Sequence, residues 1–264
     1  MGRAGTIGGR TRRPRGHMDH SELIHVIEAE ASRLALTVRA RPEAVPSHYP
    51  EWTAVDVAAH TGRLFHRTAD VVSRLAQEAP EPVAPPSEDP AEVIAWFEDA
   101  ARTMTAELRA ADPEAEVWGV RPGYTVGRWT VRMTMEAVVH RWDVESGGAT
   151  PSPIDPGVAA LGIDEFATMW APRITYDGDD LAGMVVEMIG GEAEHAWTVH
   201  LAGRGCSMMR GGGSAADATI AGSTGSLFLW LNGRVPTAEL AVTGDVAAVE
   251  GLATAARGLP RAAR

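Results

Sequence analysis

Residues 134–148, TMEAVVHRWDVESGG, place an acid, a histidine and a second acid within one predicted helix. At about 100° per helical residue, Glu136, His140 and Asp143 lie within roughly 60° of one another, beside an apolar arc that includes Val138. A Glu-x-x-x-His pair at this spacing is common by chance on exposed helix faces, so the motif alone is weak. The stretch predicts a helix that packs against a core and carries titratable groups beside its apolar face.

Further helical segments lie on both sides of this stretch. Apolar residues recur with helical spacing over residues 20–40 and over residues 52–79, where Thr53 and Asp56 have the spacing of a capping box. Pro90 and Pro156 each follow an aspartate, as is typical of the first turn of a helix. Four long helices and a shorter fifth one predict a helical bundle.

The second half of the chain has a different pattern of secondary-structure signals. Residues 183–191, 194–202 and 215–222 are short β-rich runs separated by glycines, and helix-like segments follow at 223–234 and 244–258. The sequence therefore predicts an α+β protein of two domains, a four-helix bundle followed by a small domain with a short-stranded sheet. The predicted boundaries are a bundle over 19–172, a linker over 173–183, an α+β domain over 184–257 and a tail over 258–264.

Composition restricts the classes of function. The formal net charge is −11, and the first 16 residues hold five arginines and no acid, so the rest of the chain is more acidic still. This argues against a nucleic-acid partner. We expect residues 1–18 to lie outside the fold, as a disordered basic arm, an expression artefact or a start codon assigned too far upstream. No run approaches the roughly 20 apolar residues of a membrane span, which predicts a cytoplasmic protein without a membrane partner.

His60 is a second histidine that is expected to face the core of the bundle. Steps of 3, 4, 7 and 4 from Val57 lead to His60, Leu64, Val71 and Leu75, so this histidine is expected on the core-facing stripe of its helix. A core histidine that is satisfied by a backbone carbonyl is the ordinary explanation.

Facing helices of a bundle also build metal sites from inward histidine and glutamate side chains. His60, Glu136 and His140 form a set of two imidazoles and one carboxylate, which suits a divalent ion such as zinc and leaves positions open for water or substrate. Asp143, one turn beyond His140, is expected to orient that imidazole through its second nitrogen. The single cysteine, Cys206, is expected to be a bystander rather than a nucleophile.

Three segments carry a resemblance to a known family: VPSHYPEWTAVDVAAHTGRLFHR at 45–67, RMTMEAVVHRWDVESG at 132–147 and ATIAGSTGSLFLWLNGR at 218–234. Over about residues 20–256 the chain resembles the mycothiol-dependent maleylpyruvate isomerase family, which has a DinB-like metal-binding bundle and a C-terminal α/β domain. The resemblance implies metal ligands at His60, Glu136 and His140. It also implies that Arg234 pairs with a substrate carboxylate, although a surface arginine after a helix is an equal alternative. One departure is His48 and an extra residue where many relatives carry Val-Pro-x-Cys-Pro-x-Trp.

The resemblance also implies a chemistry. A bound divalent cation, zinc first among the candidates, would lower the pKa of a thiol cosubstrate, mycothiol, and make it a nucleophile. The thiolate would then isomerise a small electrophile that carries a cis double bond, or would be transferred to the electrophile. No segment is assigned to binding the thiol. Two alternatives stay open: a non-catalytic ligand-binding or sensing module with a sterol-carrier-like C-terminal domain, and a thiol-independent metal-dependent hydrolase.

Overall fold

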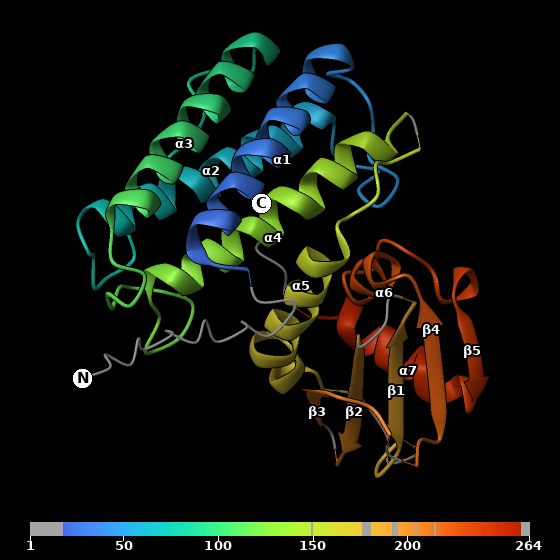
Figure 1. Ribbon diagram of the computed structural model, residues 1–264. Coiled ribbons are helices and arrows are strands. Elements are labelled where there is room, and N and C mark those ends of the chain that lie inside the picture. Colours follow the sequence, from blue (N-terminus) through green and yellow to red (C-terminus); the bar gives the residue numbers. More distant parts are fainter. Residues whose placement is uncertain are drawn as a thin grey trace, which may run out of the picture.

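The computed structural model describes residues 18–148, 150–175, 181–191, 195–203, 205–213 and 215–259. The predicted basic arm, except Met18, lies outside the described residues, as do the middle of the predicted linker and most of the predicted tail. The described residues form a helical bundle and a small domain with a five-stranded sheet (Figure 1). This confirms the predicted α+β fold class. No helix among the described residues is long and apolar enough to cross a membrane.

The bundle consists of α1 (His20–Ala40), α2 (Ala54–Ser73), α3 (Pro90–Ala110) and α4 (Val126–Ser146). Asp19 and Thr53 close capping boxes at the starts of α1 and α2, and Asp89 caps α3 ahead of Pro90. These side chains satisfy backbone N–H groups that the first helical turn leaves unpaired. α2 packs on α3, α1 packs on α3 and α4, and α2 also packs directly on α4, so the two ligand-bearing helices are neighbours.

The inward stripe of α2 is shorter than expected. Val57, His60 and Val71 are buried, but the helix ends at Ser73, and Leu75 lies beyond it with a φ of 45° and an exposed fraction of 47%. The expected core position of Leu75 is therefore wrong. The chain leaves the helix in a turn in which Ala76 N–H donates to the carbonyl of Val71, and this turn directs Leu75 outward.

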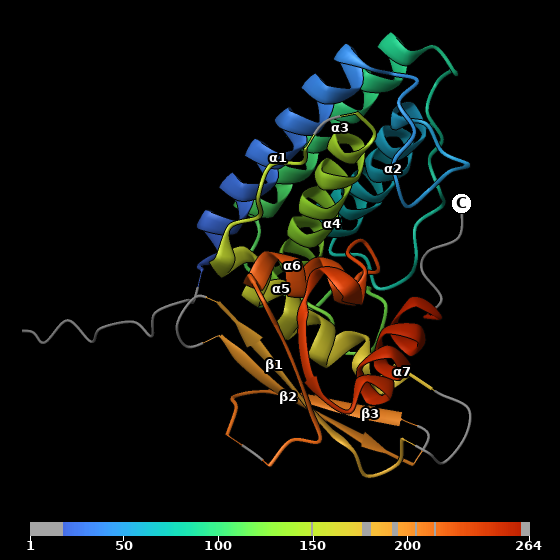
Figure 2. The ribbon, with the colours of Figure 1, turned by 90° about the vertical axis from the view of Figure 1, so that its right-hand side faces the viewer.

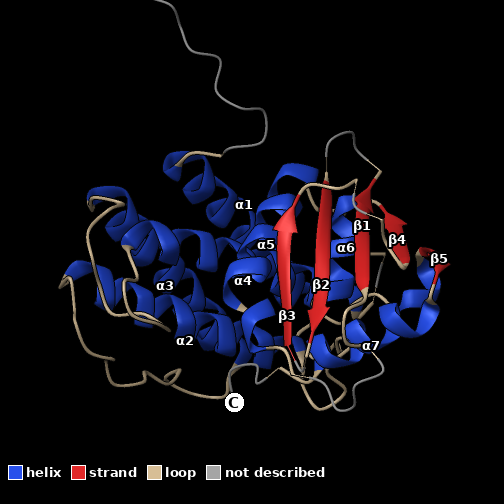
Figure 3. Ribbon diagram, turned by 90° about the horizontal axis from the view of Figure 1, so that it is seen from below, coloured by secondary structure: helices blue, strands red, loops and turns tan. Residues whose placement is uncertain are grey.

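The small domain holds β1 (Val185–Gly190), β2 (Ala196–Ala202), β3 (Gly205–Arg210), β4 (Ala218–Gly222), α6 (Thr224–Leu231), β5 (Ala241–Gly244) and α7 (Val246–Arg257). Strand order is β3-β2-β1-β4-β5, with only β1 and β4 parallel among these described strands. Figure 3 shows the helices behind one face of the sheet. The sequence did not predict β3 and β5, which are edge strands with largely exposed side chains and therefore lack a clear apolar alternation.

Helix α5 (Pro156–Met169) lies with α6 between the bundle and the sheet (Figure 2). Ile163 and Phe166 of α5 belong to the same apolar core as the sheet. Gly162 permits the close approach of α4, α5 and α6, because a Cβ there would lie 2.4 Å from a ring carbon of Phe228 and 2.6 Å from the Met135 sulfur. The two halves therefore meet over packed side chains, while the exact domain boundaries remain predictions.

Candidate metal centre

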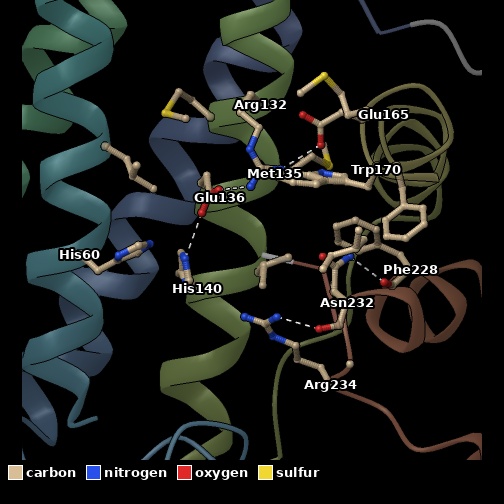
Figure 4. Close-up of a pocket in the computed structure, with 18 of the residues that line it drawn as sticks. His60, Arg132, Met135, Glu136, His140, Glu165, Trp170, Phe228, Asn232 and Arg234 are labelled. Carbon is tan, nitrogen blue, oxygen red and sulfur yellow. Dashed lines mark hydrogen bonds and ion pairs between the residues drawn. The ribbon is translucent and has the colours of Figure 1, made fainter. Parts of the chain in front are cut away.

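The structure brings together the three side chains that the sequence singled out as metal ligands. One ligand atom from each of His60, Glu136 and His140 lies within 4.8 Å of the others. His60 comes from α2 and the other two from successive turns of α4, and Figure 4 shows all three side chains pointing toward one another. The two imidazole rings meet edge to face, with centroids 5.0 Å apart. The facing helices thus place two nitrogen donors and one carboxylate around a common point.

His140 is held from both sides. Its Nε2 lies 3.0 Å from Glu136 Oε2, and its Nδ1 lies 3.0 Å from Asp143 Oδ2. Arg234 follows α6 in the other domain and donates to both oxygens of Asp143, at 3.1 and 2.9 Å. Asp143 is fully buried and Arg234 is 4% exposed. The orientation of this imidazole therefore depends on a side chain from the small domain.

Arg234 has little capacity left for another partner. It donates to the Asn232 carbonyl at 2.7 Å and to the Tyr49 hydroxyl at 2.9 Å, besides its two bonds to Asp143. A guanidinium has five N–H donors, so four are in use. The assignment of Arg234 to a substrate carboxylate stays a prediction, and in this structure its bonds connect the two domains.

A second cluster of charged side chains lies on the other side of Glu136. Arg132, one turn earlier on α4, pairs with Glu136 and donates to Glu165 Oε2 of α5 at 3.1 Å. Its guanidinium also lies 5.4 Å from the Trp170 ring centre. Since Arg132 engages one oxygen of Glu136, the other oxygen is oriented toward His140 and the common point.

The electrostatic environment separates the two histidines. Burial, and then the neighbouring His140, lower the pKa of His60 to about 4, so this imidazole is neutral at physiological pH. Burial also acts to lower the pKa of His140, but hydrogen bonds to Asp143 and Glu136 outweigh it and raise that pKa. Burial opposes the ionisation of Glu136, yet Arg132 and His140 hold the pKa of its carboxyl well below the usual range.

The residues present fit a divalent ion. His60 offers a neutral nitrogen and Glu136 offers an ionised oxygen. His140 Nε2 faces Glu136, and a bound cation would replace the proton on this nitrogen. The opposite nitrogen of His140 donates to a carboxylate, as in the histidine ligands of many zinc sites. The chemistry of this donor set suits zinc and several other divalent metals.

The three side chains line a cavity of about 530 Å³ between the domains. The segment VPSHYPEW supplies His48, Tyr49 and Trp52 to the wall. Trp52 packs between Tyr49 and His60, with ring centres 5.1 Å from each. Phe228 and Asn232 complete the wall from the small domain, as Figure 4 shows.

Cys206 is not among the lining residues. It lies half-buried in β3, and its thiol donates to the Ala171 carbonyl at 3.3 Å. Burial raises the pKa of this thiol to about 11. A thiol that stays protonated at neutral pH is a poor nucleophile, in keeping with the bystander role predicted for it.

Sequence reasoning missed Arg132 and Glu165. Arg132 precedes Glu136 by four residues, a spacing that signals an ion pair on a helix. Glu165 gave no such signal, because its proximity to Arg132 depends on how α5 crosses α4.

Residues 24–145 match the Mycothiol maleylpyruvate isomerase N-terminal domain family. The match spans both helices that carry the three candidate ligands. The helical bundle belongs to this family. No curated protein matches the chain.

Among solved structures, this protein is similar to the mycothiol-dependent maleylpyruvate isomerase, with a TM-score of 0.62 and 13% sequence identity. A mutant of the same enzyme gives a TM-score of 0.63, also at 13% identity. Both alignments cover 87% of this chain and 95% of the solved chain. The fold is therefore shared over both domains, including the sheet that follows the bundle.

Proposed function

We propose that this protein is a divalent-metal-dependent enzyme that activates a low-molecular-weight thiol, mycothiol, toward a small electrophile. Its reaction is the cis-trans isomerisation of the electrophile or the transfer of the thiol to it. The observation that carries the proposal is the convergence of His60, Glu136 and His140 at the wall of a cavity between the domains. The family of the bundle and the fold shared with a mycothiol-dependent maleylpyruvate isomerase support it.

The residues of the chain divide the work. His60, Glu136 and His140 would hold the cation, which when bound lowers the pKa of a coordinated thiol and so supplies a nucleophile at neutral pH. Asp143 keeps the Nδ1 proton of His140 and fixes the ring in place. The apolar side chains of Trp52, Val139 and Phe228 in the wall exclude water that would compete with the thiol.

The test begins with metal content. Wild type, His60→Ala and His140→Ala are purified without chelators, and bound metals are measured by mass spectrometry. We expect about one equivalent of divalent metal in wild type and little in either variant. A wild type that is free of metal and fails to bind added zinc contradicts the proposal.

The second measurement addresses the thiol. Zinc-loaded wild type is assayed with maleylpyruvate and with neutral electrophiles, in the presence and absence of mycothiol. We expect turnover only with the thiol, and its loss in His140→Ala. Turnover by hydrolysis without any thiol would instead favour the metal-dependent hydrolase.

A further inference from the structure

One arginine of the cavity wall differs from the others. Arg67 of α2 lines the cavity and is only partly exposed. Among the residues that the structure describes, its guanidinium makes no hydrogen bond or ion pair. A guanidinium has five N–H donors, and a partly buried one without a protein partner is ready to bind an anion.

Two other arginines among the lining residues are already held in close ion pairs. Arg132 is paired with Glu136 and Glu165, and Arg234 is paired with Asp143. Arg257 of α7 also lines the cavity, but its side chain is 45% exposed and reaches only Glu250 of its own helix, at 4.0 Å.

The acids of the wall do not engage Arg67 either. Glu136 and Glu165 are bound to Arg132, and Glu51, the third acid among the lining residues, forms no ion pair with Arg67 within the described chain. Within the part of the chain that the structure describes, no ion pair therefore cancels the positive charge of Arg67.

The position of Arg67 relative to the metal ligands is set by the helix. It follows His60 by seven residues, with Leu64 between them, and all three line the cavity. Seven residues correspond to about two turns, which returns to nearly the same face after a rise of about 10 Å. His60 and Arg67 therefore line the same side of the cavity, about two helical turns apart.

We propose that Arg67 binds a carboxylate of the electrophilic substrate and so selects anionic over neutral electrophiles at this site. The inference rests on the proposed function for the identity of the reaction, but the carboxylate contact itself is independent of turnover. It assigns to α2 a specificity-determining residue, while the paired Arg234 maintains the contact between the domains.

Two probes that differ by one charge test the inference. Monomethyl maleate carries one carboxylate and dimethyl maleate carries none, and both are cis alkenes that a thiolate attacks. KM and kcat are measured for zinc-loaded wild type, Arg67→Gln, Arg67→Lys and the control Arg128→Gln in the presence of mycothiol. Arg128 is exposed on the first turn of α4 and outside the cavity lining, so its variant removes the same charge elsewhere.

We expect Arg67→Gln to raise KM for monomethyl maleate about tenfold with little change in kcat, because the lost contact is made equally in the bound substrate and in the transition state. Arg67→Lys should recover part of the loss, dimethyl maleate should respond to neither substitution, and Arg128→Gln should resemble wild type. An Arg67→Gln variant with wild-type KM for the acid overturns the inference.

Calorimetric titration of maleate into zinc-loaded protein without thiol separates this inference from the proposed function. If wild type shows no thiol-dependent turnover but Arg67→Gln still weakens maleate binding about tenfold, the carboxylate site stands without the proposed function. If turnover is present and maleate binds both proteins equally, the carboxylate site is wrong and the proposed function stands.

Discussion

Arg234 and Asp143 are 91 residues apart in the sequence and form a bidentate pair that is almost completely excluded from solvent. Asp143 lies on α4 of the bundle, whereas Arg234 follows α6 of the small domain. The two opposite charges of this pair neutralise each other, and Asp143 also accepts a hydrogen bond from His140. The pair therefore couples the contact between the domains to the orientation of a candidate metal ligand.

Removing one partner of this pair should destabilise the fold and loosen the metal. Arg234→Met leaves Asp143 buried without its counter-charge, and such losses cost about 3–5 kcal/mol. Zinc affinity should fall about 10- to 100-fold, because the Asp143 carboxylate is no longer held in the position in which it orients His140. Chemical unfolding and chelator competition measure the two effects. The exposed pair Arg210–Asp164 is the control, and Arg210→Met should cost less than about 1 kcal/mol.

Zinc binding should release a proton from His140. At pH 6 the raised pKa of His140 keeps this imidazole protonated in the metal-free protein, whereas His60, with a pKa of about 4, is already neutral. We expect about one proton to be released per zinc, and the apparent affinity to fall as the pH decreases, since protons compete for the same nitrogen. Calorimetry in buffers of different ionisation enthalpy counts the protons. Release of two protons at pH 6 would contradict the low pKa of His60.

Glu165 should make stability depend on pH. Its Oε1 is buried without a hydrogen-bond partner among the described residues, and burial raises the pKa of its carboxyl above the model-peptide value. The folded state then holds this proton more tightly than the unfolded state. The resulting stability is complete below the unfolded pKa of 4.5 and is lost as the pH rises through the folded value.

Glu165→Gln removes this titration and keeps an oxygen for Arg132. The melting temperature of the variant relative to wild type should therefore rise between pH 4.5 and pH 8. Glu98→Gln, which alters an exposed carboxylate paired with Arg39, is the comparison and should show no such trend. A constant difference between Glu165→Gln and wild type across this range would argue against a raised pKa for Glu165.

Cys206 should resist alkylation. Because burial raises its pKa from 9.0 to about 11, the folded protein contains almost no thiolate at pH 8. Iodoacetamide should modify the native thiol at least tenfold more slowly than the urea-unfolded chain, and the native rate should increase up to about pH 11. Equal rates in the two states would contradict the described environment of Cys206.

Sequence reasoning predicted the helices well and the small sheet only in part. Asp19, Thr53 and Asp89 mark the starts of their helices in the sequence, because each capping side chain accepts from backbone N–H groups within three residues. The candidate ligands could also be predicted from local spacing, since Glu136 and His140 share a helix face and His60 lies on the same apolar stripe as Val57. The edge strands β3 and β5 have no such local signature, because their pairing partners rather than their own residues define them.

The contacts of Arg234 could not be read from spacing. They require the small domain to dock so that this side chain reaches both Tyr49 and Asp143, and docking is a property of two complete surfaces. The same holds for Glu165, whose partner Arg132 lies 33 residues away on another helix.

The cavity has two walls that belong to separate apolar cores. One core contains α2 and part of α4, and the other contains α5, α6, the sheet, and Met135, Val138 and Val139 of α4. Substitutions at Phe228 or Asn232 can reshape one wall while α2, which carries His60, keeps its own packing. An evolving lineage, or an engineer, can therefore exchange the recognised electrophile by remodelling the C-terminal wall, provided that Arg234 is kept to hold Asp143 and, through it, His140.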